Sequence, residues 1–189
     1  SDDLLMIGFQ KVGGQLEMYL YPIELKIGNR GLAKKGLGQG KRTAELLYQY
    51  LDNDSFKANF YRNFFAKLAI VSAEKLKLYN IWDEHKWFYI IKEYREDLLR
   101  NNFILSNRLW GLIGQFGLVH FESKFLSIDL KMEKDHIYAE FPEAEGYNYL
   151  LRSVDSLIEL FHNKPTSIDK ALLLANKLID GEVPEYKSE

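Results

Sequence analysis

Two apolar stretches separated by a short turn open the chain. Residues 4–9 form a continuous apolar run, and residues 16–27 alternate loosely between apolar and polar positions. Gly13 and Gly14 lie between the two stretches, and a turn of this composition is typical of a hairpin. The pattern therefore predicts two paired β-strands. Pro22 has no backbone N–H, so it predicts a bulge or an edge position within the second strand.

Helical spacing follows in the middle of the chain. Residues 28–40 contain five glycines and predict a flexible loop. A helix is expected from Lys41 onward, and residues 56–82 and 84–100 predict two more. Residues 52–55 break the pattern and supply a helix cap. The helix from Lys41 would present one apolar face, formed by Ala44, Leu47, Tyr48 and Leu51.

The last third of the chain returns to strands and then to helices. Residues 109–141 are strand-like, with clear alternation over 125–132 and a second run at 136–141. Residues 147–162 and 167–178 again have helical spacing. This part of the sequence therefore predicts further strands followed by two helices.

The order of these elements indicates the fold class. Strands, helices, strands and helices in succession predict one α/β domain with a central mixed β-sheet flanked by helices. We expect this single domain to span residues 1–181 and residues 182–189 to form a flexible tail. The chain begins at Ser1 directly before an apolar run, which indicates a piece of a longer protein.

Composition narrows the chemistry. The chain has no cysteine, which excludes disulfides, thiolate zinc sites and cysteine nucleophiles and fits a reducing, cytoplasmic compartment. Aromatic residues make up 14% of the chain, and at helical spacing we expect them in the core. The histidines are too scattered for a zinc site, and His120 is expected to be a hydrogen-bonded core histidine. No apolar run approaches the ~20 residues that span a membrane.

The charge is distributed unevenly. The net charge of −2 does not by itself predict nucleic-acid binding. The segment from Lys26 to Arg42, however, contains basic residues and no acidic one. Basic side chains and backbone amides near a helix N-terminus suit DNA phosphates. We therefore expect phosphate contacts from Arg30, Lys34, Lys35, Lys41 and Arg42.

Three residues form the pattern that carries chemistry. Asp3 precedes the first predicted strand, and Glu24 and Lys26 lie two residues apart on the second, hence on one face. Pairing of the strands as a hairpin brings Asp3 level with Glu24. Two carboxylates suit a hard cation such as Mg²⁺, which polarises a phosphate oxygen and activates a bound water. A neighbouring lysine orients that water or offsets charge that develops on the phosphate.

An acid before one strand and Glu-x-Lys on the next resemble the PD-(D/E)XK nuclease superfamily. The resemblance implies a restriction-endonuclease-like fold, DNA as substrate and Mg²⁺ or Mn²⁺ as cofactor. It also implies that Asp3, Glu24 and the backbone carbonyl of Leu25 hold the metal. Lys26 would assist the attack, and Gln39, close to the expected helix from Lys41, would help to position the reacting groups.

The same segment has a second, narrower likeness. Residues 23–28 and the basic segment are similar to the C-terminal nuclease-like domain of bacterial ATPases in DNA phosphorothioation-dependent restriction. This implies a restriction, defence or DNA-repair protein in which the partner is the remainder of a larger ATPase or helicase. A helix normally precedes the first acid in the superfamily, and none precedes Asp3 here. A non-catalytic DNA-binding or protein-docking module is therefore the alternative.

Glu-x-Lys by itself is a weak signal, because the chain repeats it. Glu122 and Lys124 fit the pattern, and so do Asp129 and Lys131 on a strand-like run. Glu24 is distinguished from these repeats by the preceding acid, the hairpin and the basic segment that follows. The interpretation as a nuclease site depends on that context.

Overall fold

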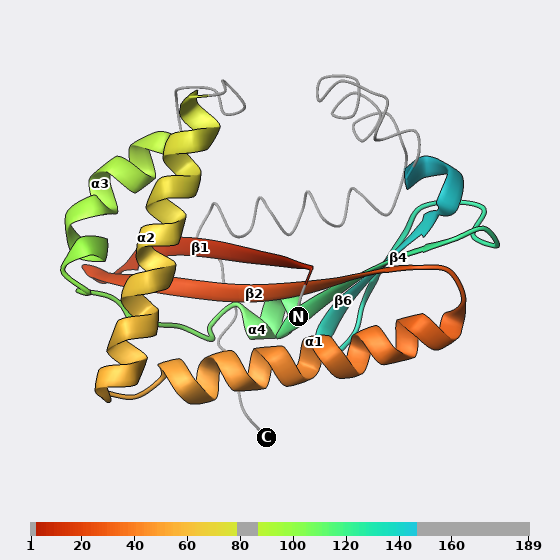
Figure 1. Cartoon of the computed structure of the whole chain (residues 1–189), viewed down its shortest axis with the longest axis horizontal. Helices are drawn as coiled ribbons and strands as arrows, with labels where there is room; N and C mark the ends of the chain where they lie inside the picture. The colour runs from red at the N-terminus through yellow and green to blue at the C-terminus, as the bar shows by residue number, and fades with distance from the viewer. Residues whose placement is uncertain (1–2, 79–86, 147–189) are drawn as a thin grey trace. The chain divides into compact units, whose positions relative to one another are not determined.

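A computed structural model describes residues 3–78 and 87–146 of the chain (Figure 1). Contacts between Cα atoms divide these residues into two compact units. Unit 1 contains residues 3–5, 21–44 and 107–146, and unit 2 contains residues 6–20 together with the described part of 45–106. The predicted extent of a single domain over residues 1–181 stays a prediction. The predicted helices at 147–162 and 167–178 and the tail at 182–189 lie outside the described residues.

The strands form a six-stranded mixed sheet in the order β1-β2-β4-β6-β5, and β3 also pairs with β2. β2 runs parallel to β3 and β4, β4 runs parallel to β6, and β5 runs antiparallel to β6. The strands are β1 (Leu4–Val12), β2 (Gln15–Ile27), β3 (Ile104–Leu105), β4 (Phe116–Glu122), β5 (Asp129–Met132) and β6 (His136–Pro142). This sheet and its helices confirm the predicted α/β class with a central mixed β-sheet.

The predicted hairpin is present. β1 ends at Val12 and β2 begins at Gln15, so Gly13 and Gly14 alone form the turn. Both glycines have positive φ angles, +57° and +88°. A two-residue turn with positive φ at both positions matches the right-handed twist of the paired strands, and glycine adopts it without strain.

Pro22 does not mark an edge strand, so that part of the prediction is wrong. β2 lies between β1 and β4 in the sheet, and Pro22 is almost fully buried. On the side of β2 opposite β1, β3 pairs with Glu17 and Met18, and β4 pairs from Ile23 onward. Pro22 therefore lies where β2 changes its partner, at a position where no ladder bond requires its missing N–H.

Helix α1 (Arg30–Leu51) corrects the predicted loop over residues 28–40. Four of the five glycines lie in this helix, and two of these four allow close packing on the sheet. A Cβ atom built at Gly36 would lie 2.8 Å from Cδ1 of Leu118, and one built at Gly40 would lie 2.5 Å from Cδ2 of Phe116. Tertiary packing thus outweighs the cost of glycine in a helix, which is roughly 1 kcal/mol per residue.

Two further helices belong to unit 2. α2 (Phe56–Leu78) and α3 (Trp87–Leu99) lie side by side (Figure 1). They occupy most of the ranges predicted for them, and residues 79–86 between them lie outside the described part.

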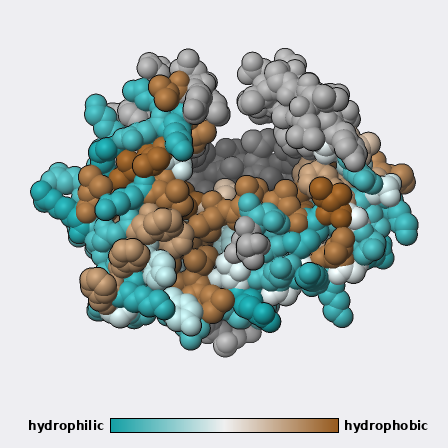
Figure 2. Space-filling model, in the orientation of Figure 1, coloured by the Kyte–Doolittle hydropathy of each residue, from teal (hydrophilic) through white to brown (hydrophobic). Residues whose placement is uncertain are grey.

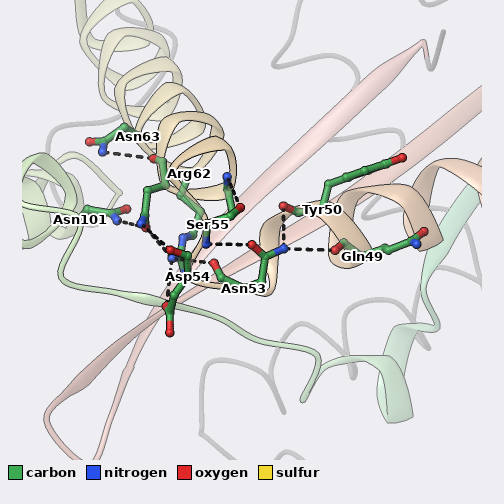
Figure 3. A network of polar contacts seen from close by, with 10 residues as sticks. Gln49, Tyr50, Asn53, Asp54, Ser55, Arg62, Asn63 and Asn101 are labelled. Atoms are coloured by element: carbon green, nitrogen blue, oxygen red, sulfur yellow. Dashed lines mark hydrogen bonds and ion pairs between the residues drawn. The ribbon is translucent and has the colours of Figure 1, made fainter.

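A polar network fixes the turn between α1 and α2 (Figure 3). The Ser55 hydroxyl accepts a hydrogen bond from the Ala58 amide at 3.1 Å, so Ser55 is the expected helix cap. Arg62 donates to the Asn59 side-chain oxygen at 2.6 Å, and Asn101 donates to the same oxygen at 3.0 Å. These bonds connect the beginning of α2 to the segment that follows α3.

The predicted strand-like region over residues 109–141 begins instead with a short helix, α4 (Trp110–Ile113). Gly114 then allows a close approach of the chain, because a Cβ atom at this position would lie 2.5 Å from the backbone of Asp135. β4, β5 and β6 follow, and β5 and β6 cover the core of the two predicted alternating runs. The expectation of strands is therefore correct for most of the region and wrong at its start.

The aromatic residues of α2 are not in the core, which corrects another expectation. The helix buries Ile70 and four alanines. Its large apolar side chains are exposed, with exposed fractions of 88% for Phe56, 61% for Phe60 and 52% for Phe64. Figure 2 shows hydrophobic side chains gathered over this helix. We call the exposed side chains the α2 row, which consists of Phe56, Phe60, Phe64, Leu68, Val71 and Leu78.

Candidate active site

Unit 1 brings together the three residues of the predicted chemical cluster. Asp3 lies directly before β1, and Glu24 and Lys26 lie on β2. The Leu25 amide donates to Asp3 Oδ2 at 2.8 Å, which fixes the acid beside the strand. Lys26 Nζ lies 3.5 Å from Asp3 Oδ2 and also forms an ion pair with Glu24 Oε2. Both carboxylates therefore converge on one ammonium group.

The cluster runs from the interior of the unit to its surface. The side chain of Glu24 is fully buried, that of Lys26 is 15% exposed and that of Asp3 is 44% exposed. Burial lowers the pKa of Lys26, but the hydrogen bond and charge of Glu24, followed by those of Asp3, outweigh it. The pKa of Lys26 is therefore raised above its ordinary value, and the side chain remains a cation at neutral pH.

Two neighbours hold β2 in place around the cluster. In the parallel pairing with β4, Glu24 is level with Leu118 and Lys26 is level with His120. Gly36 of α1 packs over the same region, because a Cβ atom built there would lie 3.0 Å from Cγ of Lys26. α1 and β4 therefore fix the stem of Lys26 and leave its ammonium group at the two carboxylates.

The donor set fits a hard cation. Asp3 and Glu24 supply carboxylate oxygens, the ligands that Mg²⁺ and Mn²⁺ prefer, and both carboxylates contact the ammonium group of Lys26. Within the described residues, no group of three or more histidine and acidic side chains is suitably placed for a metal. If a metal ion binds here, Asp3 and Glu24 are the carboxylates that would hold it, with water as further ligands.

The remaining predicted residues all lie on α1. Arg30, Lys34, Lys35, Lys41 and Arg42 are exposed, as phosphate-binding side chains must be. Gln39 is half-buried, and its Oε1 atom has no hydrogen-bond partner among the residues that the structure describes. Among the described residues, neither Asp3 nor Lys26 forms a polar contact with Gln39. The structure thus places Gln39 on the neighbouring helix without joining it to the cluster.

His120 is the hydrogen-bonded core histidine that we expected. It is fully buried, and its Nε2 atom lies 2.7 Å from the carbonyl oxygen of Gly28. A carbonyl only accepts, so Nε2 carries the proton. Nδ1 lies 2.8 Å from the oxygen of the Tyr138 hydroxyl. Burial, followed by the charge and hydrogen bond of Glu140 and the charge of Glu122, raises the pKa of Tyr138 to about 12, so this hydroxyl keeps its proton.

The two repeats of the Glu-x-Lys pattern have other surroundings. Glu122 ends β4 and is buried, with an exposed fraction of 5%. Asp129 and Lys131 lie on β5 at the end of the sheet, where Lys131 Nζ is 3.7 Å from Asp129 Oδ2 and 2.7 Å from Glu140 Oε2. Two carboxylates therefore meet one lysine here as well, but this lysine is more exposed than Lys26 and neither carboxylate is fully buried. Sequence reasoning did not select Glu122 as a functional residue, because its surroundings depend on segments far away along the chain.

Comparison of the chain with protein-family models, with curated proteins and with solved structures finds no match. The likeness to PD-(D/E)XK nucleases therefore rests on the sequence pattern of Asp3, Glu24 and Lys26 alone. Among the described helices, none is long and apolar enough to cross a membrane.

Proposed function

We propose that this chain is a metal-dependent DNA endonuclease domain, part of a longer bacterial restriction, defence or DNA-repair protein. One observation carries the proposal: the carboxylates of Asp3 and Glu24 converge on the ammonium of Lys26. The three residues come from the start of β1 and from β2, and they are the residues that the superfamily pattern selects. The exposed basic side chains of α1, in the same unit, add a surface suited to DNA phosphates.

Each residue of the cluster would have its own role in phosphodiester hydrolysis. A Mg²⁺ or Mn²⁺ ion, held by Asp3, Glu24 and the Leu25 carbonyl, would supply Lewis-acid activation of water and phosphate. Lys26 stays protonated, so it serves as a cation that stabilises negative charge on the phosphate and orients water by donating hydrogen bonds. It does not serve as a general base, because a raised pKa keeps its proton in place. The basic side chains of α1 bind the DNA backbone, and Gln39 is the candidate positioning residue.

Substitution of the cluster tests this function. Glu24→Gln and Lys26→Ala should each abolish Mg²⁺- or Mn²⁺-dependent cleavage of DNA. We expect the cleavage rate to fall by about 100-fold or more, as it does when a group that stabilises charge in the transition state is removed. Asp129→Asn and Lys131→Ala are matched controls, since they alter the same sequence pattern on β5 and should cleave normally. Circular dichroism and thermal unfolding must show that all four variants are folded. Full cleavage by folded Glu24→Gln and Lys26→Ala would contradict the proposal.

A second candidate is a DNA-binding module without catalysis. It is favoured by the complete burial of Glu24 and its pairing with Lys26, because a buried ion pair of this kind also serves to hold a fold together. In that case the wild-type protein binds DNA with an affinity that falls steeply with salt, but it does not cleave DNA when Mg²⁺ or Mn²⁺ is added. The same set of variants distinguishes the two candidates, since only the nuclease loses an activity.

A further inference from the structure

A cavity of about 530 Å³ lies at the beginning of α1 in unit 1. Its size falls within the range of small-molecule sites. Residues from the loop before α1, from its first turn and from the segment that follows β4 surround it. They are Asn29, Arg30, Gly31, Glu122, Lys124 and Phe125.

The walls of the cavity are held in a fixed arrangement. The Gly28 amide donates to the Phe121 carbonyl at 2.8 Å, and the Gly28 carbonyl accepts from His120 at 2.7 Å. The Asn29 side chain accepts from the Gly31 amide at 3.1 Å and so caps the 22-residue helix α1. The loop at the cavity is therefore tied to both β4 and α1, and it presents the positive end of the helix dipole to the cavity.

Two cations of the cavity are available to a ligand. Arg30 and Lys124 are exposed, and neither forms an ion pair with another described residue. Together with the end of α1 they form a site for an anionic group such as phosphate.

Glu122 adds a hydrogen-bond acceptor to the cavity, beside its two cations. It lines the cavity and is 95% buried, with an exposed fraction of 5%. Its Oε2 atom has no hydrogen-bond partner within the described chain. The nearest basic atom, His120 Nε2, is 3.9 Å away and gives its proton to Gly28. A buried carboxylate oxygen without a donor is costly, so a ligand that supplies an N–H group would bind there.

We propose that this cavity binds one nucleotide of single-stranded or locally opened DNA. The phosphate contacts Arg30 and Lys124, the half-buried Phe125 ring forms an apolar wall, and Glu122 accepts from the exocyclic amino group of cytosine or adenine. Carboxylate side chains accept from the cytosine amino group in known DNA complexes. Thymine has no such group, so the site discriminates against it. The inference rests on the proposed function for its choice of DNA as ligand.

The position of the cavity relates it to the candidate active site. Lys26 is level with His120 in the pairing of β2 and β4, and Glu122 lies two residues further along β4 on the same face. The nucleotide site is therefore about 7 Å along the strand from the level of Lys26, at about 3.3 Å per residue. A nucleotide bound in the cavity would therefore lie close to the candidate active site.

Binding measurements without metal test the site separately from cleavage. Fluorescence anisotropy in EDTA, with labelled eight-nucleotide strands of dC, dA or dT, measures affinity while no hydrolysis takes place. The wild-type protein should bind dC and dA about fivefold or more tightly than dT. Glu122→Gln should remove most of this preference, because the amide both accepts and donates and no longer favours an amino group.

Removal of a cation should have a different effect. Arg30→Ala and Lys124→Ala should weaken binding of all three strands alike and reduce the slope of log affinity against log salt by about 0.7. Lys134→Ala is the matched control, because Lys134 is an exposed lysine in the turn before β6, at the opposite ends of the strands, and should bind as the wild type does. Since Arg30 is exposed, its variant keeps the fold even if Glu122→Gln does not.

The outcomes separate this inference from the nuclease proposal. A dC and dA preference that depends on Glu122, in a protein that never cleaves, supports the nucleotide site and contradicts the nuclease. Cleavage without any base preference, or affinities unchanged by Lys124→Ala, overturns the nucleotide site and leaves the nuclease standing.

Discussion

At the level of single residues, Lys26 forms ion pairs with two carboxylates at the same time, and both pairs affect the stability of the fold. Glu24 lies in the interior with no exposed surface, and Asp3 lies at the surface. The lysine reduces the cost of burying the Glu24 carboxylate and also ties the start of β1 to β2. The same contacts that make the cluster a candidate metal site therefore stabilise the hairpin.

Removal of the lysine charge should destabilise the protein. We expect Lys26→Met to lower the free energy of unfolding by about 3 kcal/mol, because it leaves a buried carboxylate without its cationic partner. Glu24→Gln combined with Lys26→Met should cost much less, since no buried charge remains. Urea denaturation of the wild type, the single variant and the double variant measures both effects. Equal destabilisation of the single and double variants would show that the ion pair does not hold the hairpin.

The pKa of Lys26 predicts the pH range of this contribution. The folded pKa is raised above 10.5, so the stability from protonated Lys26 is fully present below pH 10.5 and is lost as the pH rises through the folded pKa. The difference in stability between the wild type and Lys26→Met should therefore be constant from neutral pH to about pH 10 and shrink above it. Denaturation curves at a series of alkaline pH values measure this difference. A difference that already disappears near pH 8 would contradict the assignment.

At the level of elements, the packing of α1 on the sheet depends on the positions of its glycines. Ala33, Gly36, Gly40 and Ala44 are buried, and their spacing places them on one face of the helix. Small side chains on this face allow the helix to approach β4 closely. Gly38, by contrast, is exposed and has no atom within 4 Å of an added Cβ.

Substitution by alanine should therefore have opposite effects at two glycines of the same helix. Gly38→Ala should raise the free energy of unfolding by about 0.5–1 kcal/mol, because alanine favours the helix and meets no neighbour. Gly40→Ala should lower it by about 1–3 kcal/mol, because its methyl group collides with the buried ring of Phe116. Thermal or chemical denaturation of the two variants measures the contrast, and a stabilising effect of both substitutions would show that α1 does not pack as described.

The elements also show what local sequence patterns are able to predict. The hairpin and the convergence of Asp3, Glu24 and Lys26 follow from a two-residue turn and the period of a strand, both of which are local. The helix over residues 30–40 does not, since its glycines are stabilised by Phe116 and Leu118, which lie far away in the sequence. Glu122 was missed for the same reason: its cavity forms only when β4 pairs with β2.

At the level of the whole molecule, α2 reverses the usual distribution of side chains. It buries alanines and exposes the α2 row, although apolar patches on monomeric proteins are normally small. The face also carries positive charge, with Lys57, Lys67, Lys75 and Lys77 exposed on the helix. This surface is the observation that favours a protein-docking module, the alternative that we predicted from the sequence.

The α2 row should be detectable in solution. The double substitution Phe60→Ser and Phe64→Ser should reduce binding of a hydrophobic fluorescent dye to the native protein and should reduce concentration-dependent association. It should change the free energy of unfolding by no more than about 0.5 kcal/mol, because exposed side chains contribute little to folding. Leu126→Ser, at a side chain that is 97% exposed in unit 1, is the control for an isolated apolar group. Dye binding that is the same in wild type and double variant would contradict the exposure of the row.

The division into two units also affects the order in which a ribosome can assemble the protein. Unit 2 is complete once residue 106 has been synthesised, whereas unit 1 needs residues from 107 onward. Asp3, Glu24 and Lys26 leave the ribosome before Leu118 and His120, which are level with Glu24 and Lys26 in the sheet, by on the order of ten seconds at ordinary rates of translation. The hairpin that carries the candidate active site is thus synthesised before the strand that encloses it. During nascent-chain folding, unit 2 can form while the acidic cluster is still open to solvent.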